Sequence, residues 1–231
     1  MSVSAVLFSG GLDSAVLLAE EAARGEVQPV YVRVGLAWER AETAAIKRLM
    51  TTDLIKSTMR PLVSLTVDMS DVYPASHWAM QGRPPAYDTP DEDVYLPGRN
   101  IVLLGKAGVF CASAGITRVV LGTLDHNPFP DATPSFRAAM ASALSLGLAH
   151  TLRIDAPYAQ ASKADVIRKG DRLGVPLELT LSCMNPREGR DGIAHCGVCS
   201  KCRERHDAFL EAGIIDRTDY ADRTHIDGRG M

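Results

Sequence analysis

The chain has 231 residues, of which 46% are hydrophobic, and its formal net charge at pH 7 is -3. This length and composition suffice for one hydrophobic core with a small appendage and exclude a disordered chain. The slightly acidic balance argues against a large nucleic-acid surface, because tRNA and DNA binders carry a basic excess. The sequence has neither a basic-then-apolar leader nor an apolar run long enough to span a membrane, so we expect a cytoplasmic protein that acts on a small molecule away from membranes.

The first expected strand, residues 3–8, leads directly into a loop that favours phosphate. The strand is apolar, partly β-branched and too short for a helix. The loop reads Ser9-Gly10-Gly11-Leu12-Asp13-Ser14, and a helix-forming series follows it as far as Gly25. Adjacent glycines allow the close approach of an anion, and the free amides at the helix start, with the two serine hydroxyls, suit pyrophosphate. The alternative is an ordinary glycine-rich turn, but the serines and the aspartate favour the phosphate site.

Strand-like and helical patterns then alternate along the chain. Further strands are expected at residues 30–34, 62–67, 118–123 and 153–156, and helices at about 39–54, 101–114 and 201–212. Asn100 is the expected N-cap of the second of these helices, which places Arg99 at a helix start, where it would meet an anion or lie on the open surface. Alternation of this kind predicts an α/β fold in which helices cover both faces of a parallel sheet, and ligands bind at the carboxyl ends of the strands.

Two segments depart from this alternation. Residues 68–96 form a long polar stretch whose acidic run we interpret as a solvated loop, with a mobile lid or a partner surface as the alternative. Residues 216–231 are polar and are expected to be loose, except where Tyr220 anchors them.

The chain has five cysteines, and four of them lie close together near the C-terminus. Cys111 stands alone in an apolar helical stretch and is expected to be a buried core residue. The other four have the spacing C-x12-C-x2-C-x2-C, which is typical of a closed structural zinc site. An iron–sulfur cluster is the alternative metal centre, and unrelated buried thiols are the alternative without a metal.

We therefore predict an α/β domain over residues 1–175 and a zinc-binding helical segment over 176–231. The expected metal ligands are Cys183, Cys196, Cys199 and Cys202.

The loop and the cysteine array occur together in one known family. Ser-Gly-Gly-x-Asp-Ser after a first strand resembles the PP-loop of the ATP pyrophosphatases, which cut ATP between the α and β phosphates and transfer AMP to an oxygen of their substrate. With the cysteines, nearly the whole chain resembles the 7-cyano-7-deazaguanine synthase family, also called QueC. Further matching motifs lie at residues 96–100, at Gly122-Thr123 with Asp125, at Phe129-Pro130-Asp131 with Phe136, and at residues 162–165, 180–183 and 195–205.

The resemblance implies a fold of the PP-loop, HUP-like type and a reaction on 7-carboxy-7-deazaguanine in the pathway to queuosine-type bases. The carboxylate would become an amide and then a nitrile, with ATP for activation, ammonia as the nitrogen source, and Zn2+ and Mg2+ as metals. Such an enzyme is an ATP-dependent ligase that forms a carbon–nitrogen bond. Release of AMP and release of ADP with phosphate both stay open, as does a homodimer.

The resemblance also implies roles for particular residues. Lys163 and Arg99 would offset the charge of the phosphates, and Asp13 would support the loop or a magnesium ion. Asp131 would accept hydrogen bonds from the amino edge of a guanine-like ring, and Asp125 and Arg99 would complete the substrate site. The expected ATP-binding residues are Phe8, Ser9, Gly10, Gly11, Leu12, Asp13, Ser14, Ala15, Val16, Leu17 and Leu18.

One stretch departs from the family pattern. Family members carry Y-G-Q-R-H after the second strand, whereas residues 34–38 read V-G-L-A-W, and beyond them only Glu42 stays in register. A QueC-like paralogue that adenylates a different carboxylate, on a small molecule or on a protein C-terminus, is therefore an alternative. A PP-loop tRNA-modifying enzyme is another, although Cys111 alone is left to handle sulfur. A nucleotide-sensing or nucleic-acid-binding module is the third, suggested by the basic residues Arg187, Arg190, Lys201, Arg203 and Arg205.

Overall fold

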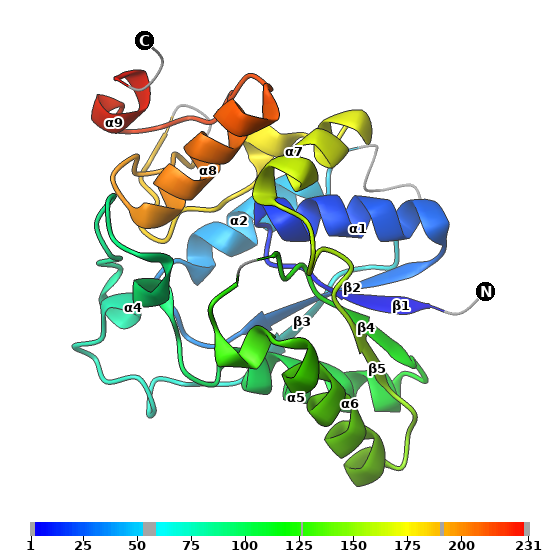
Figure 1. The fold of residues 1–231 in the computed structure, drawn as a ribbon. Helices are drawn as coiled ribbons and strands as arrows, with labels where there is room; N and C mark the ends of the chain where they lie inside the picture. Colours follow the sequence, from blue (N-terminus) through cyan, green and yellow to red (C-terminus); the bar gives the residue numbers. More distant parts are fainter. Residues whose placement is uncertain (1–2, 53–58, 126, 190–191, 229–231) are drawn as a thin grey trace.

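A five-stranded parallel sheet forms the centre of the computed structural model, which describes residues 3–52, 59–125, 127–189 and 192–228 (Figure 1). The strand order is β3-β2-β1-β4-β5, and each neighbouring pair runs parallel. Each expected strand is present, and the second begins three residues earlier than expected. The strands are β1 Ser4–Leu7, β2 Val27–Arg33, β3 Val63–Thr66, β4 Arg118–Val120 and β5 Arg153–Asp155.

Helices cover both faces of the sheet, so the predicted α/β fold class is confirmed (Figure 1). One face carries α1 Leu12–Arg24, α2 Glu39–Leu49 and α7 Lys163–Arg172, with α8 Ser200–Ala212 packed on α7. The other face carries α5 Arg99–Ser113 and α6 Pro134–Leu148. The shorter helices are α4 Trp78–Gln81 and α9 Thr224–Asp227, with 3-10 turns at Asp91–Val94, Pro130–Ala132 and Leu177–Leu179.

The two core layers follow from the side-chain alternation of the strands. In β1, Val6 packs in the layer that contains α1 and α7, whereas its neighbour Ala5 packs in the layer that contains α5. Cys111 of α5 is completely buried in this second layer, so its prediction as a core residue is confirmed. Burial raises the pKa of the Cys111 thiol to about 12, which makes it an inert apolar side chain at neutral pH.

The strand order creates a crevice next to β1. From β1 the chain moves through β2 to the edge strand β3, and it then returns to place β4 on the opposite side of β1. The loops that follow β1 and β4 therefore diverge at the carboxyl end of the sheet, which is where open α/β sheets bind ligands. The glycine-rich loop, Ser9 to Ser14, lies at this switch point, and its last three residues form the first turn of α1.

Two of the expected helix boundaries are wrong. α5 begins at Arg99, after Gly98 with φ +75°, so Asn100 lies inside the helix and is not its N-cap. α2 ends at Leu49, and the expected extension runs into residues 53–58, which lie outside the described part of the chain. In residues 216–228, the expected anchoring by Tyr220 is confirmed, because Tyr220 is buried against the cysteine segment, and Ile226 is buried there as a second anchor that was not expected.

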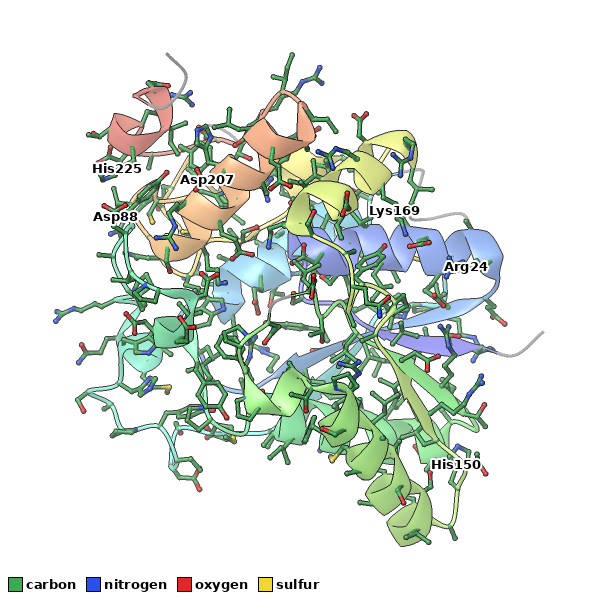
Figure 2. All side chains as sticks on the ribbon, in the orientation of Figure 1. Arg24, Asp88, His150, Lys169, Asp207 and His225 are labelled. Carbon is green, nitrogen blue, oxygen red and sulfur yellow. The ribbon has the colours of Figure 1, made fainter. Side chains whose placement is uncertain are left out.

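The segment 68–96 combines an exposed acidic run with buried apolar residues. Residues 91–93 are exposed, which agrees with the solvated interpretation of the acidic run. In contrast, Tyr73 and Leu96 join the core on the α5 side, and the Trp78 ring stacks on Trp38 at a centroid distance of 5.7 Å. Farther along the segment, the Tyr87 ring stacks on His225 of α9 at a centroid distance of 4.3 Å. This segment therefore also contacts the C-terminal part of the chain, and the next residue, Asp88, lies near His225 in Figure 2.

In the part of the chain that the structure describes, every helix falls short of the length or the apolar character that a membrane crossing requires.

Candidate active site and cysteine cluster

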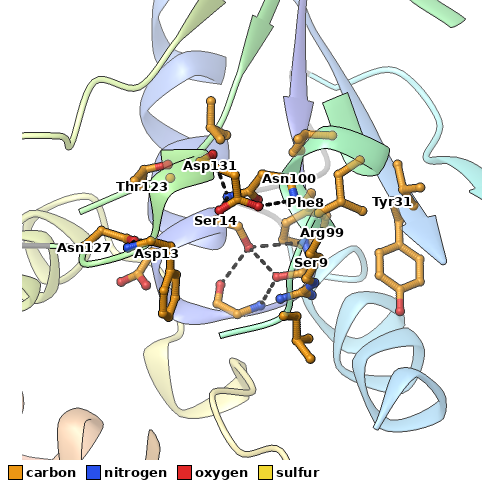
Figure 3. A pocket seen from close by; sticks show the side chains of 18 of the residues that line it. Phe8, Ser9, Asp13, Ser14, Tyr31, Arg99, Asn100, Thr123, Asn127 and Asp131 are labelled. Atoms are coloured by element: carbon orange, nitrogen blue, oxygen red, sulfur yellow. Dashed lines mark hydrogen bonds between the residues drawn. The ribbon is translucent and has the colours of Figure 1, made fainter. Parts of the chain in front are cut away.

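The glycine-rich loop is held by its own serines. The Ser14 hydroxyl donates a hydrogen bond to the Gly11 carbonyl at 3.0 Å and accepts one from the Ser9 amide at 3.3 Å (Figure 3). The Gly11 amide donates to the Ser9 hydroxyl at 3.3 Å. Gly10 has φ +76°, and a Cβ there would lie 3.0 Å from Ile46 Cγ1, so this position requires glycine. These bonds fix the N-terminus of α1 at the crevice. The free backbone amides of a helix N-terminus in this position can bind an anion.

Two neighbouring cavities meet at this loop, each with a volume of about 280 Å³. The first lies beneath the carboxyl ends of β1, β2 and β4 and reaches the start of α5 (Figure 3). The second extends from the loop toward α7, α8 and the segment that precedes the cysteine cluster. Ser9, Gly11, Asp13 and Arg99 are among the residues that line both. This arrangement can hold two substrates whose reactive groups come together over the loop.

The expected ATP-binding residues divide into two groups. Phe8, Ser9, Gly11, Asp13 and Ser14 line the first cavity, and Leu12 lines the second. The remaining five residues line neither cavity. Gly10 packs against Ile46 of α2, and the four helical residues are fully buried in the core beneath the loop and support it: Ala15, Val16, Leu17 and Leu18.

Lys163 stands beside the loop because the sequence starts a helix there. Ser162 caps α7 in a reciprocal arrangement: its hydroxyl accepts from the Asp165 amide at 3.1 Å, and the Asp165 carboxylate accepts from the Ser162 amide at 3.2 Å. From this first turn, Lys163 Nζ donates to Asp13 Oδ2 at 3.0 Å and to Glu204 Oε1 at 2.7 Å. Burial alone lowers the pKa of Lys163, but the two carboxylates outweigh it and raise the pKa above its usual value, so the amine stays charged.

Arg99 and Asp131 lie where the first cavity meets α5. Arg99 lines both cavities, and its Nε is buried with no hydrogen-bond partner among the described residues. Asp131 is only 5% exposed and lines the first cavity, whereas Asp125 lines the second. The three residues expected at the substrate site therefore do not share one cavity, and Arg99 alone reaches both.

Glu42 is a buried carboxylate at the wall of the second cavity. It accepts hydrogen bonds from the Tyr31 hydroxyl at 2.7 Å and from the Trp38 indole at 3.2 Å. Burial raises its pKa, and the nearby charge of Arg99 opposes this shift. The sequence offered only its register with the family pattern as a signal, and no role was expected for it.

Residues 34–38, which depart from the expected family pattern, are held mainly by apolar packing. Val34 and Leu36 are buried, and Trp38 lines the second cavity with its ring on Trp78. Glu39 holds the turn, since its Oε1 accepts from the amides of Val34 and Gly35 at 2.5 and 2.9 Å. This wall of the cavity therefore presents an indole where the sequence resemblance led us to expect polar side chains.

The four clustered cysteines come together as the spacing predicts. Their sulfur atoms all lie within 4.8 Å of one another and are buried. The Sγ–Sγ distances of 4.0, 3.8 and 3.5 Å agree with the edge of about 3.8 Å that a tetrahedron of Zn–S bonds of about 2.3 Å requires. Backbone amides of Cys196 and Gly197 point at the sulfurs of Cys183 and Cys202, at 3.2 and 3.4 Å, as donors do around thiolates. The cluster can hold one metal ion such as zinc.

The basic residues near the cysteines do not form an open cationic surface. Arg205 is fully buried and donates to Thr180, Thr218 and the Leu177 carbonyl. Lys201 binds Glu204, and Arg203 donates to the Thr89 carbonyl. Arg187 is exposed, and Arg190 lies outside the described residues. At least three of these five side chains are engaged within the chain, which weakens the nucleic-acid alternative.

Comparison with known proteins agrees with this site. A curated protein named 7-cyano-7-deazaguanine synthase from Anaeromyxobacter dehalogenans is 34% identical to this chain, over 94% of this chain and 94% of the relative. One of the same name from Thermoplasma volcanium is 33% identical, over 94% of this chain and 90% of the relative. The synthase of that name from Methanopyrus kandleri is 33% identical over 95% of this chain and 99% of its own length. A solved structure described as a predicted subunit of a tRNA methyltransferase from Methanocaldococcus jannaschii aligns over 97% of this chain and 94% of its own chain. Its sequence identity is 13% and its TM-score is 0.48, so this similarity is too low to indicate a function. The family model described as queuosine biosynthesis protein QueC matches residues 3–213, and this chain belongs to that family.

Proposed function

We propose that this protein is an ATP-dependent ligase that converts 7-carboxy-7-deazaguanine to 7-cyano-7-deazaguanine in queuosine-type biosynthesis. The observation that carries the proposal is the meeting of two cavities at the glycine-rich loop, beside the ammonium of Lys163 and the guanidinium of Arg99. The name of the curated relatives supplies the product, and the acceptor is the carboxylate that the sequence resemblance implies.

The chemistry needs activation because a carboxylate is anionic and lacks a leaving group. In the first step a carboxylate oxygen attacks the α-phosphorus of ATP, the bond to the β-phosphate oxygen breaks, and pyrophosphate leaves. Ammonia then attacks the acyl carbon, and AMP leaves with the former carboxylate oxygen to give the amide. In the second round the amide oxygen takes AMP from another ATP, and loss of AMP with the two nitrogen-bound protons leaves the nitrile. AMP and pyrophosphate are then the released products, rather than ADP and phosphate.

The residues contribute by positioning and by stabilising charge. The amides at the start of α1 and the hydroxyls of Ser9 and Ser14 would hold the departing pyrophosphate. Lys163 and Arg99 would offset its charge, and the buried Nε of Arg99, which has no partner among the described residues, suits an anion. Asp13 Oδ1 is buried with no hydrogen bond among the described residues, so this oxygen suits a magnesium ion that accompanies the nucleotide.

The cysteine cluster would hold zinc in a structural site. Four sulfurs within 4.8 Å of one another suit a single ion, whereas an iron–sulfur cluster needs its cysteine sulfurs farther apart to enclose several metal atoms. All four positions of a tetrahedron would be filled by protein, so this metal would stabilise the fold rather than bind substrate.

A second acceptor is favoured by one observation. Trp38 stands where the family carries polar side chains, and it lines the second cavity together with Glu42. An indole at this wall suits an acceptor with an apolar or aromatic face, so a paralogue that adenylates a different carboxylate is the second candidate.

The test is mass spectrometry of the full reaction. Purified protein is incubated with 7-carboxy-7-deazaguanine, ATP, magnesium and ammonium, and the deazaguanine and nucleotide products are identified. We expect the amide and the nitrile together with AMP. The reaction without ammonium should yield acceptor-dependent exchange of pyrophosphate into ATP. Nucleotide consumption that does not depend on this acceptor would overturn the substrate assignment, and the absence of AMP would overturn the adenylation.

A further inference from the structure

Glu204 is a carboxylate shared by two lysines at the wall of the second cavity. Its Oε1 accepts from Lys163 Nζ at 2.7 Å, and its Oε2 accepts from Lys201 Nζ at 2.5 Å. All three side chains line this cavity, as does Asp13 of the loop, which also binds Lys163. Asp91 Oδ1 lies 3.9 Å from Lys201 Nζ and 3.8 Å from Arg203 Nη2, so the whole group contains three cationic and three anionic side chains and its charges cancel.

The position of Glu204 depends on the cysteine cluster. Cys199 is the N-cap of α8, Cys202 lies in the first turn, and Glu204 follows on the next turn. At the other end of α8, the Arg168 guanidinium of α7 donates to the Glu211 and Ala212 carbonyls at 2.6 and 3.3 Å. α8 is therefore held at both ends, and its carboxylate meets the first residue of α7 at a defined place.

We propose that Glu204 is a positioning residue that aligns Lys163 and Lys201 toward the pyrophosphate released at the glycine-rich loop, and that Lys201 is a second phosphate-binding lysine delivered by the cysteine segment. This inference rests on the proposed adenylation. The carboxylate is charged and has no proton to donate, so it cannot bind phosphate itself and acts through the two ammoniums. The cysteine cluster thereby gains a part in catalysis, because it determines where α8 places this group.

The steady-state constants of a Glu204→Gln variant separate positioning from a general structural role. The substitution removes one negative charge from a balanced group, so the cavity becomes more attractive to the phosphates of ATP. At the same time the amide keeps one acceptor oxygen but turns an NH2 group toward the other ammonium, so the two lysines are no longer aligned together, and misplaced charge costs rate rather than affinity. We therefore expect kcat for AMP release to fall about tenfold or more, while KM for ATP stays unchanged or falls.

Glu211→Gln is the matched control, because Glu211 is an exposed carboxylate on the same helix. This variant should keep both constants. Zinc content and the melting temperature are measured for each protein, so that a loss of the fold is recognised directly.

A double-mutant cycle on binding provides the second measurement. The dissociation constant of α,β-methylene-ATP is measured by calorimetry for the wild type, Lys163→Met, Glu204→Gln and the double variant. If Glu204 acts through Lys163, the effect of its substitution should change by about threefold or more once the lysine is gone, whereas Glu211→Gln should be additive with Lys163→Met.

The outcomes decide between the two levels of the proposal. A wild type that releases no AMP defeats the adenylation itself. If the wild type releases AMP but Glu204→Gln has the same kcat or a higher KM for ATP, the positioning role is wrong and the adenylation stands. If Glu204→Gln does not fold, Lys201→Gln replaces it. We then expect a lower kcat and a higher KM for ATP, and wild-type constants for this variant would overturn the inference.

Discussion

Asn100 and Asp131, which lie 31 residues apart in the sequence, are joined by three hydrogen bonds. The Asn100 backbone amide donates to Asp131 Oδ2 at 3.0 Å, and its side-chain amide donates to the Asp131 carbonyl at 3.1 Å and to Oδ1 at 3.3 Å. The carboxylate is thus held at the N-terminus of α5, and it lines the first cavity (Figure 3). Asn100 supports the site through this bond instead of capping the helix.

Replacement of Asp131 by Asn should impair recognition of the acceptor. The substitution keeps the shape but places an amide where a guanine-like ring would present N–H donors, so one or two charge-assisted hydrogen bonds are lost. We expect KM for 7-carboxy-7-deazaguanine to rise about tenfold or more, with little change in KM for ATP. Steady-state kinetics with each substrate varied in turn measure both constants.

The control for this variant is Asp171→Asn, since Asp171 is exposed on α7 and lines neither cavity. A rise in KM for ATP with an unchanged KM for the acceptor would show that the nucleotide occupies the first cavity, and the role expected for Asp131 would then be wrong.

Gly10→Ala should damage the loop, because the position combines a left-handed backbone with a close contact. A methyl group at φ +76° would lie 3.0 Å from Ile46 Cγ1 and 3.3 Å from the Glu42 carbonyl. We expect the free energy of unfolding to fall by about 1–3 kcal/mol, with weaker binding of ATP analogues. Gly25→Ala is the matched control, since Gly25 follows the same helix with extended φ, and a methyl group there would have no other atom within 4 Å among the described residues. Urea unfolding and calorimetry compare the two, and equal losses in both variants would contradict the explanation.

The sheet could be predicted from the sequence because its signals are local. Apolar runs such as residues 3–8 and 118–123 are bounded by glycine and polar residues, and parallel pairing follows from the helices between them. The packing of residues 68–96 could not be predicted, because the aromatic residues that bury it are scattered among prolines and acidic residues. The Trp38–Trp78 stack joins residues 40 positions apart, and no local pattern specifies such a contact.

The candidate site was predictable only in its sequence motifs. The loop, Lys163 and the cysteines each carry a motif, and the structure brings the loop and Lys163 into contact. Glu204 gave no such signal, and the motif that contains Asn100 suggested only a helix cap, because each residue acts on a partner far away in sequence, Lys163 or Asp131. Which charged side chains face each other across a cavity depends on how α5, α7 and α8 pack, and this packing is a property of the whole fold.

Loss of the metal should destabilise the C-terminal part of the chain. Cys199→Ser removes one of four sulfurs that are buried together, which leaves the remaining thiols without a shared ion. We expect zinc content to fall well below one per chain and the melting temperature to fall by about 10 °C, equivalent to about 3 kcal/mol for a protein of this size. Cys111→Ala is the control, because this buried cysteine lies outside the cluster and should leave the zinc content unchanged. Metal analysis and thermal unfolding test both variants, and wild-type stability of a metal-free protein would refute a structural role.

Glu42 should make stability depend on pH in a direction opposite to that of a salt-bridged carboxylate. Burial raises its pKa in the folded protein above the usual value for glutamate, so between these two pKa values the folded chain keeps a proton that the unfolded chain has lost. The free energy of unfolding therefore falls as pH rises through this interval, by at most about 1.4 kcal/mol for each pH unit.

Glu42→Gln has no such proton to lose, and its amide can still accept from Tyr31 or Trp38. We expect its stability relative to the wild type to increase from about pH 5 to about pH 8, as measured by urea unfolding at several pH values. Glu211→Gln, on the surface of α8, should follow the wild type throughout, and parallel pH profiles for the wild type and Glu42→Gln would exclude a raised pKa at this carboxyl group.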